Sequence, residues 1–181
     1  MSPNSLETIF SQLNQHDVRY LVVGGLACSA HGHVRATMDL DIVVALDEAN
    51  AKRMVEALSG LGYRPTAPVR AEEFVKKTTR MDWKQNKNMV VFQMVSGNLA
   101  DTPVDIFVDE PFNFEKEYAR APRIEIASGI QVPIVHIEQL IRMKEEAGRA
   151  KDIADVETLK KINSPEIKIA APNNPRQKRK Q

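Results

Sequence analysis

The stretch GGLACSAHGHVRATMDLD, residues 24–41, decides the fold that this sequence predicts. It begins with the pair Gly24-Gly25 directly after an apolar run, a pattern that predicts a tight turn from a strand into a helix. It ends with Asp39 and Asp41, which lie one residue apart at the start of a second apolar run. Side chains alternate along a β-strand, so both carboxylates are predicted to point to one face of the sheet.

Two carboxylates on one face of a strand provide the hard oxygen ligands that Mg²⁺ prefers, usually together with substrate phosphates. Acids in an apolar strand repel one another unless a cation neutralises them, which disfavours the alternative of solvated acids at a strand edge. Asp105 lies in a further apolar run and would complete a three-carboxylate cluster from a neighbouring strand. A single acid at a strand end is also common, but the combination favours a site in which Asp39, Asp41 and Asp105 hold two Mg²⁺ ions.

The glycine pair also predicts a phosphate site. Free backbone N–H groups and the helix dipole favour a phosphate at a helix N-terminus, and glycine lets the phosphate approach the backbone. A plain turn is the alternative, because a Gly-Gly pair alone is a weak signal. The spacing of Gly24 and Gly25 to the two aspartates favours the functional interpretation.

The remaining hydrophobic periodicity predicts an α+β fold, with a mixed β-sheet flanked by helices. Strands are expected over residues 19–23, 38–45, 89–95 and 103–108, with a hairpin of residues 123–127 and 130–134. Helices are expected after a cap at Asn4, and over residues 26–31, 47–60, 70–77, 136–147 and 152–162, with Ile153 in the core stripe of the last; residues 80–88 are expected to form a polar loop. Strands and helices do not alternate strictly, which favours a mixed sheet over a doubly wound one.

The length of 181 residues predicts a single domain, residues 1–163, followed by a basic tail. Residues 164–181 contain five basic residues and one acidic residue, so 20 basic and 23 acidic residues remain in the predicted domain. The tail is also rich in proline and is expected to be disordered. Cys28 is the only cysteine, and neither a signal peptide nor a membrane span of roughly 20 apolar residues is present, so a cytoplasmic protein without membrane contact is expected.

Charged residues near the C-terminus allow two interpretations. Lysines beside a triphosphate are expected at any phosphoryl-transfer site, and Lys144 would direct its ammonium to the mouth of the cleft if its helix lines that cleft. Alternatively, Lys144 is a solvated helix lysine, while Asp152 caps the last helix and Asp155 lies in its first turn. Physical chemistry alone leaves both interpretations open for Lys144, Lys151, Asp152 and Asp155.

The motifs Gly-Gly, Asp-Leu-Asp and Val-Asp-Ile-Phe together resemble the DNA polymerase β-type nucleotidyltransferase superfamily in its minimal, single-domain form. The fuller pattern from Gly24-Gly25-Leu26-Ala27 through Ala30-His31-Gly32 to residues 35–41 is similar to the AbiE-type, abortive-infection nucleotidyltransferase toxins. Residues 144–156 resemble the C-terminal Lys and Lys-Asp-x-x-Asp helix motif of that family. The resemblance covers about residues 18–160.

The resemblance implies a nucleotidyltransferase-like fold and an enzyme that moves a nucleoside monophosphate from an NTP to an acceptor hydroxyl, with Mg²⁺ as cofactor. It implies an RNA acceptor such as tRNA, or a protein acceptor, and a toxin with a cognate antitoxin as partner. The catalytic residues that it implies are Asp39, Asp41, Asp105, Lys144 and Asp152. The nucleotide-binding residues that it implies are Gly24, Gly25, Arg35, Thr37, Lys151 and Asp155.

Two other functions remain as alternatives. One is a catalytically silent module that binds a nucleotide or a protein and regulates it, although a binding-only site has no need of three clustered acids. The other is a small-molecule nucleotidyltransferase of the aminoglycoside-modifying kind. The identity of the acceptor separates these functions, and no sequence feature names the acceptor or the preferred NTP.

Overall fold

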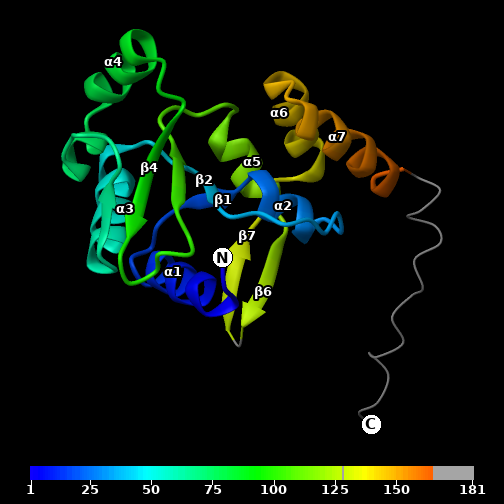
Figure 1. The fold of residues 1–181 in the computed structure, drawn as a ribbon, viewed down its shortest axis with the longest axis horizontal. Coiled ribbons are helices and arrows are strands. Elements are labelled where there is room, and N and C mark those ends of the chain that lie inside the picture. Colours follow the sequence, from blue (N-terminus) through cyan, green and yellow to red (C-terminus); the bar gives the residue numbers. More distant parts are fainter. Residues whose placement is uncertain (128, 165–181) are drawn as a thin grey trace.

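The computed structural model describes residues 1–127 and 129–164 (Figure 1). Its central feature is a five-stranded sheet with the strand order β1-β2-β5-β4-β3. Strands β2 and β5 run parallel, and the other neighbouring strands pair antiparallel. The strands are β1 (Tyr20–Val22), β2 (Leu40–Val44), β3 (Tyr63–Pro65), β4 (Val91–Ser96) and β5 (Val104–Phe107). The predicted mixed sheet is therefore confirmed.

Helices surround this sheet, which confirms the α+β class. They are α1 (Pro3–Gln15), α2 (Gly24–Ala30), α3 (Glu48–Gly60), the 3₁₀ turn η1 (Ala71–Val75), α4 (Lys77–Lys87), α5 (Phe114–Arg120), α6 (Ile137–Ala147) and α7 (Ala150–Ile162). A separate hairpin of β6 (Arg123–Ala127) and β7 (Ile130–Pro133) projects beside α1 (Figure 1). Within the described residues, no helix combines the length and the apolar character that a membrane span requires.

The two faces of the central sheet differ in burial. One face carries Leu40, Ile42 and Ile106, which are completely buried in the core. The opposite face carries Asp41 and Asp105, which are only partly buried. Side-chain alternation along each strand separates the two sets. The acids therefore lie on the sheet face that the main core leaves open.

Helices α6 and α7 pack against each other on the side of the molecule away from α3 and α4 (Figure 1). Gly148 ends α6 with a left-handed backbone, at φ 62°, and its N–H donates to the carbonyl of Lys144. Glycine adopts this conformation without the steric cost that a Cβ brings. The next helix then begins with Arg149 as its N-cap and Asp152 in its first turn, which excludes the alternative in which Asp152 caps this helix.

The predicted loop over residues 80–88 is also wrong, because most of it belongs to α4. Trp83 is buried and stacks on Phe92 of β4, with ring centroids 5.2 Å apart. Arg80 is buried as well and donates to the carbonyl oxygens of Phe74, Val75 and Leu46. The buried side of α4 consists of only two residues, Arg80 and Trp83, so the mostly polar sequence shows no apolar stripe that predicts a helix.

Smaller departures from the predicted elements have local causes. Ser2, not Asn4, caps α1, because its hydroxyl accepts the N–H of Ser5. Ile153 is exposed, since α7 directs Asp152, Asp155, Val156 and Leu159 inward instead. The short elements β3 and α5 were not predicted. From residue 165 on, the predicted disordered tail lies outside the described residues.

Candidate active site

Asp41 and Asp105 occupy paired positions on the parallel strands β2 and β5, and Asp39 lies just before β2. The pKa of Asp41 is raised to about 6. Burial is the largest cause, and the neighbouring charges of Asp105 and Asp39 add to it. Burial also raises the pKa of Asp105, with a smaller contribution from Asp39. The structure therefore brings the three predicted acids near enough for their charges to interact.

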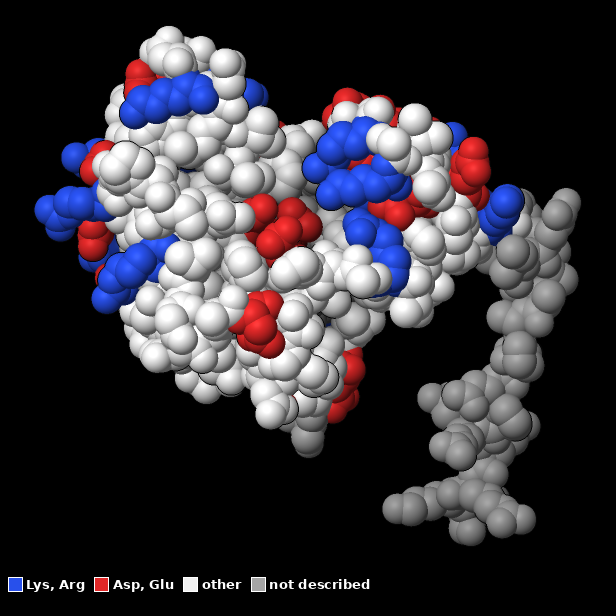
Figure 2. Space-filling model, in the orientation of Figure 1, with Lys and Arg blue, Asp and Glu red and all other residues white. Residues whose placement is uncertain are grey.

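Figure 2 shows acidic side chains gathered near the centre of the drawn face, in the region where Figure 1 places β2. Lysine and arginine side chains lie beside them, over α6 and α7 and, lower in the view, in the region of α2. The surface is indented between the part of the molecule that carries α4 and the α6–α7 pair. Acidic side chains can bind a cation, and the neighbouring lysines and arginines can bind phosphates, so this surface suits a phosphate-bearing substrate that binds together with a cation.

Gln93 of β4 is a site residue that sequence reasoning missed. It is paired with Asp105 across β4 and β5, and its Nε2 donates to Asp105 Oδ1 at 2.9 Å. This hydrogen bond lowers the pKa of Asp105, against the effect of burial. The available signal was the single amide within the apolar run Val91–Val95, because that amide shares the strand phase of its partner carboxylate.

The two glycines are packed directly against the acidic strand and the segment that precedes it. Gly24 has φ 62°, and a Cβ added there would lie 1.9 Å from Asp41 Oδ2. A Cβ at Gly25 would lie 2.6 Å from Thr37 Oγ1 and 3.0 Å from Arg35 Nη2. Separations below about 3 Å are not tolerated by real Cβ atoms. Close packing therefore accounts for both glycines, while their binding of a phosphate stays a prediction.

The segment between α2 and β2, residues 31–39, places alternate side chains on opposite sides. His33, Arg35, Thr37 and Asp39 are partly buried, whereas Gly32, Val34, Ala36 and Met38 are exposed. The segment thus behaves like a strand, with a polar side that faces the protein and an apolar side that faces solvent. Arg35 and Thr37 reach the glycine pair because they share the inner side with Asp39.

Helices α6 and α7 contribute a buried group of charges. Lys144 Nζ donates to Asp155 Oδ2 at 2.6 Å and to Asp152 Oδ1 at 3.3 Å. Arg149 Nε donates to Asp152 Oδ2 at 2.5 Å. The side chain of Lys144 is 5% exposed and that of Asp152 is 0% exposed, so the ion pairs of Lys144 are shielded from water. Arg149 reaches Asp152 from the surface, because its own side chain is 62% exposed. Such pairing compensates the desolvation of buried charges.

Lys144 therefore does not direct its ammonium to the mouth of the cleft, as the sequence had suggested. The two buried carboxylates of α7 hold it inside, because an unpaired carboxylate there would be costly. Its charge still acts on the acidic centre, since Lys144 lowers the pKa of Asp41. The pKa of Arg149 is raised, chiefly by its hydrogen bond to Asp152 and to a smaller extent by the charges of Asp152, Asp41 and Asp155. Lys151 is exposed in the first turn of α7.

His33 and Arg149 also join this site without having been predicted. His33 Nε2 lies 2.9 Å from Asp155 Oδ1, which connects the α2–β2 segment to α7. Arg149 belongs to the same short turn as Gly148, in which the sequence pattern drew attention to Lys151 and Asp152 instead. The partner of His33 is 122 residues away, so no local sequence pattern indicates that contact. The contact of Arg149 with Asp152 has the i, i+3 spacing of a helix, which is the signal that could have indicated it.

The donor chemistry of the acidic centre fits a divalent cation. Asp39, Asp41 and Asp105 offer only carboxylate oxygens. The raised pKa of Asp41 comes first from burial and then from the like charges of Asp105 and Asp39, which a cation would neutralise. In residues 1–127 and 129–164, no group of three or more His, Cys, Asp or Glu side chains is arranged to hold a metal on its own. The assignment of Mg²⁺ to these carboxylates therefore stays a prediction.

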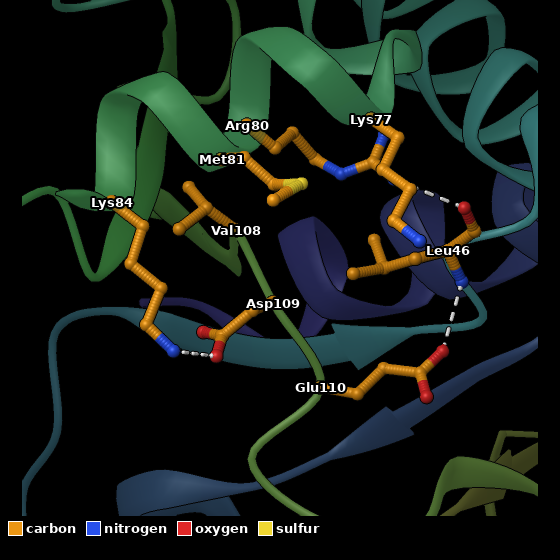
Figure 3. Close-up of a pocket in the computed structure, with 8 residues that line it drawn as sticks. All are labelled: Leu46, Lys77, Arg80, Met81, Lys84, Val108, Asp109 and Glu110. Carbon is orange, nitrogen blue, oxygen red and sulfur yellow. Dashed lines mark hydrogen bonds and ion pairs between the residues drawn. The ribbon is translucent and has the colours of Figure 1, made fainter.

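A cavity of about 370 Å³ lies elsewhere, between α4 and the segment after β5 (Figure 3). Its lining includes Lys77, Arg80, Lys84 and Asp109, and none of the predicted site residues. Lys84 forms an ion pair with Asp109, and the guanidinium of Arg80 donates to backbone carbonyls. The charges of this cavity are largely satisfied within the protein, which distinguishes it from the acidic centre.

The sequence and the fold were compared with those of known proteins. A family model described as aminoglycoside-2''-adenylyltransferase matches residues 5–159. No curated protein matches the sequence. The wider nucleotidyltransferase resemblance is confirmed, whereas the narrower resemblance to AbiE-type toxins stays a prediction.

The fold is similar to that of three solved structures. One is the crystal structure of ANT(2'')-Ia with adenylyl-2''-tobramycin, at 14% identity and a TM-score of 0.56, with 92% of each chain covered. Another is the solution structure of the antibiotic-resistance factor ANT(2'')-Ia, at 16% identity and a TM-score of 0.57, covering 92% of this chain and 87% of that one. The third is the lincosamide adenylyltransferase LnuA with lincomycin, at 14% identity and a TM-score of 0.59, covering 90% of this chain and 99% of that one. Because the family match spans most of the sequence, the chain belongs to the aminoglycoside-2''-adenylyltransferase family and is a nucleotidyltransferase.

Proposed function

We propose that this enzyme transfers a nucleoside monophosphate from an NTP to a hydroxyl group of a small, polar acceptor, and that Mg²⁺ supports the reaction. The observation that carries the proposal is the pairing of Asp41 with Asp105 on adjacent parallel strands, with Gly24 packed against Asp41. The family match and the antibiotic-modifying neighbours favour a small-molecule acceptor over RNA or protein.

In this proposal Asp39, Asp41 and Asp105 would hold Mg²⁺. Mg²⁺, when bound, would neutralise the clustered negative charges and polarise the reacting oxygens. Asp105 accepts the proton of the acceptor hydroxyl as that oxygen forms a bond to the α-phosphorus. The bond between the α-phosphorus and the bridging oxygen breaks, and pyrophosphate leaves. Burial raises the pKa of Asp105, and Gln93 opposes this rise, because its amide donates to the charged form of the carboxylate.

The cations of the site would act on the triphosphate in two ways, some by direct contact and others from a distance through their charge. Arg35 and Thr37 lie against Gly25, where helix α2 begins, and in this proposal they would contact phosphate oxygens. Lys144 and Arg149 are bound to the carboxylates of α7, so they contribute a fixed positive potential next to Asp41. Charges held in place in this way stabilise a developing negative charge without reorganising during the reaction.

The acceptor would approach over β4 and β5. The side of Asp41 that faces α2 is closed by Gly24 and Gly25. On the other side, Gln93 and Val95 of β4 lie on the same sheet face as Asp105, and Val95 is 40% exposed. An acceptor hydroxyl would therefore reach Asp105 from the β4 side, while the triphosphate would lie beside Arg35 and Thr37.

The test incubates the protein with each of the four α-³²P-labelled NTPs and Mg²⁺, in the presence of aminoglycosides, lincosamides, tRNA or a cell extract. Label on a small molecule, absent with Asp105→Asn, supports the proposal. Label on tRNA or on a protein would replace the small-molecule acceptor with the macromolecular acceptor and would revive the predicted toxin role. Transfer that survives in both Asp41→Asn and Asp105→Asn would remove these carboxylates from the reaction.

A further inference from the structure

We infer that Asp155 of α7 is a positioning residue that fixes the segment between α2 and β2, and with it the placement of Arg35, Thr37 and Asp39. The contact itself is independent of the activity, whereas its catalytic consequence rests on the proposed function. Asp155 would thus act on the substrate through other residues rather than by touching it.

The segment needs such support because its backbone provides little. His33 N–H donates to the carbonyl of Cys28, and Leu40 N–H donates to the carbonyl of Pro103. Between these two points, the backbone N–H groups of residues 34–39 donate no hydrogen bond to any residue that the structure describes. Side chains on the inner side of the segment must therefore determine where it lies.

Two of those inner side chains meet Asp155. His33 Nε2 lies 2.9 Å from Asp155 Oδ1, and Arg35 Nε lies 3.2 Å from the same oxygen. Arg35 Nε is buried and has no hydrogen-bond partner within the described residues, so its contact with Asp155 is an ion pair without hydrogen-bond geometry. One carboxylate oxygen thus holds two side chains that lie two residues apart along the segment.

The other oxygen of Asp155 connects to the rest of the site. Lys144 Nζ donates to Asp155 Oδ2 at 2.6 Å, and Cys28 Sγ of α2 lies 3.9 Å from it. The side chain of Asp155 is 4% exposed. Burial alone would raise the pKa of Asp155, but the hydrogen bonds from Lys144 and His33 and the charges of Lys144 and Arg35 lower it below its ordinary value. Asp155 is an ionised, enclosed carboxylate on which three parts of the chain converge.

Asp152 offers a matched comparison on the same helix. It is equally buried and also accepts from Lys144, but its other partner is Arg149, and it makes no hydrogen bond or ion pair with residues 31–39. Removing the charge of Asp152 therefore disturbs the buried ion pairs without releasing the segment. Removing the charge of Asp155 disturbs both.

The direct test is limited proteolysis with trypsin, which needs no substrate. Trypsin can cleave after Arg35 only when the Arg35 side chain separates from Asp155 and the segment fits into the active site of the protease. Cleavage at the Arg35–Ala36 bond is expected to become at least about tenfold faster in Asp155→Asn, as local opening becomes easier. The rate at this bond should stay close to that of the wild type in Asp152→Asn, and Asp155→Glu should restore part of the resistance. His33→Ala, which leaves the Lys144–Asp155 pair in place, should also accelerate this cleavage and covers the case in which Asp155→Asn does not fold.

Activity then separates positioning from a direct role. With acceleration at Arg35, kcat/KM of Asp155→Asn should fall by about 10²-fold, as expected for site groups displaced by about 1 Å. Unchanged cleavage at Arg35 in both Asp155→Asn and His33→Ala would overturn the inference, even if activity were lost. Equal acceleration at all tryptic sites, with a lower Tm, would also overturn it, because Asp155 would then support the whole fold. Failure of the proposed function would instead show as absent transfer in the wild type, with the cleavage pattern as expected.

Discussion

Asp41 and Asp105 lie directly opposite each other on the parallel strands β2 and β5, and Gln93 of β4 extends the same row to a third strand. The row runs across the open face of the sheet. Besides the effect of burial on both acids, the charge of Asp105 raises the pKa of Asp41, and the amide of Gln93 lowers the pKa of Asp105. We therefore expect the ionisation of these acids to affect both the stability of the protein and its proposed activity.

Gln93→Leu should shift the pH dependence of transfer. The amide of Gln93 lowers the pKa of Asp105, so its removal raises that pKa and leaves more Asp105 protonated at a given pH. A protonated Asp105 cannot accept the proton of the acceptor. The acidic limb of the pH profile of kcat/KM should move to higher pH, with full activity regained above it. An unshifted limb would mean that Asp105 is not the group that titrates.

Asp41→Asn should stabilise the protein at neutral pH when no Mg²⁺ is added. The folded pKa of about 6 lies above the ordinary value of 3.8, so the stability that Asp41 contributes is complete below pH 3.8 and is lost as the pH rises through 6. This loss amounts to at most about 3 kcal/mol. Thermal unfolding should show a Tm raised by a few degrees at pH 7.5 and little change at pH 4. A lower Tm at pH 7.5 would give Asp41 a structural role instead.

Gly24→Ala should damage both stability and activity. The φ of 62° costs an L-residue roughly 1–2 kcal/mol. The new Cβ would overlap Asp41 Oδ2, and overpacking of this kind adds about 1–3 kcal/mol. Gly97→Ala is the matched control, because a Cβ there meets nothing within 4 Å. Chemical denaturation should separate the two variants clearly, and equal stabilities would contradict the described packing of Gly24.

Lys144→Met should destabilise the fold rather than only weaken NTP binding. The substitution leaves Asp152 and Asp155 buried with one cation fewer, and breaking a buried pair from one side costs about 3–5 kcal/mol. Lys151→Met, on the exposed side of α7, should cost little. Urea unfolding of the two variants provides the comparison. If Lys144→Met kept the stability of the wild type, the ammonium would be free for substrate, as the sequence first suggested.

Much of the fold and of the acidic centre could be predicted from the sequence because the signals are local. Alternation placed Asp39 and Asp41 on one face, and apolar runs marked β1, β2, β4 and β5. The helix α4 escaped prediction because its buried face consists of Trp83 and Arg80, which a polar-looking sequence conceals.

Most contacts of the acidic residues on α7 could not be predicted from the sequence. Asp152 and Asp155 occupy positions at which solvated or capping acids are common, and only the folded chain brings Lys144 and His33 to them. These partners lie up to 122 residues away in the sequence. Contacts over such distances depend on tertiary packing, which no periodicity encodes.

The central claim is that Asp41 and Asp105 form the nucleotidyl-transfer site. The most direct test measures Mg²⁺-dependent pyrophosphate release from an NTP with an acceptor that the labelling experiment identifies. Asp41→Asn and Asp105→Asn should each lower kcat by about 10²–10⁴-fold, as expected for the loss of a group that holds the metal or takes a proton. Asp82→Asn, on the exposed side of α4, should retain the rate of the wild type. Release at the wild-type rate in both site variants would contradict the account.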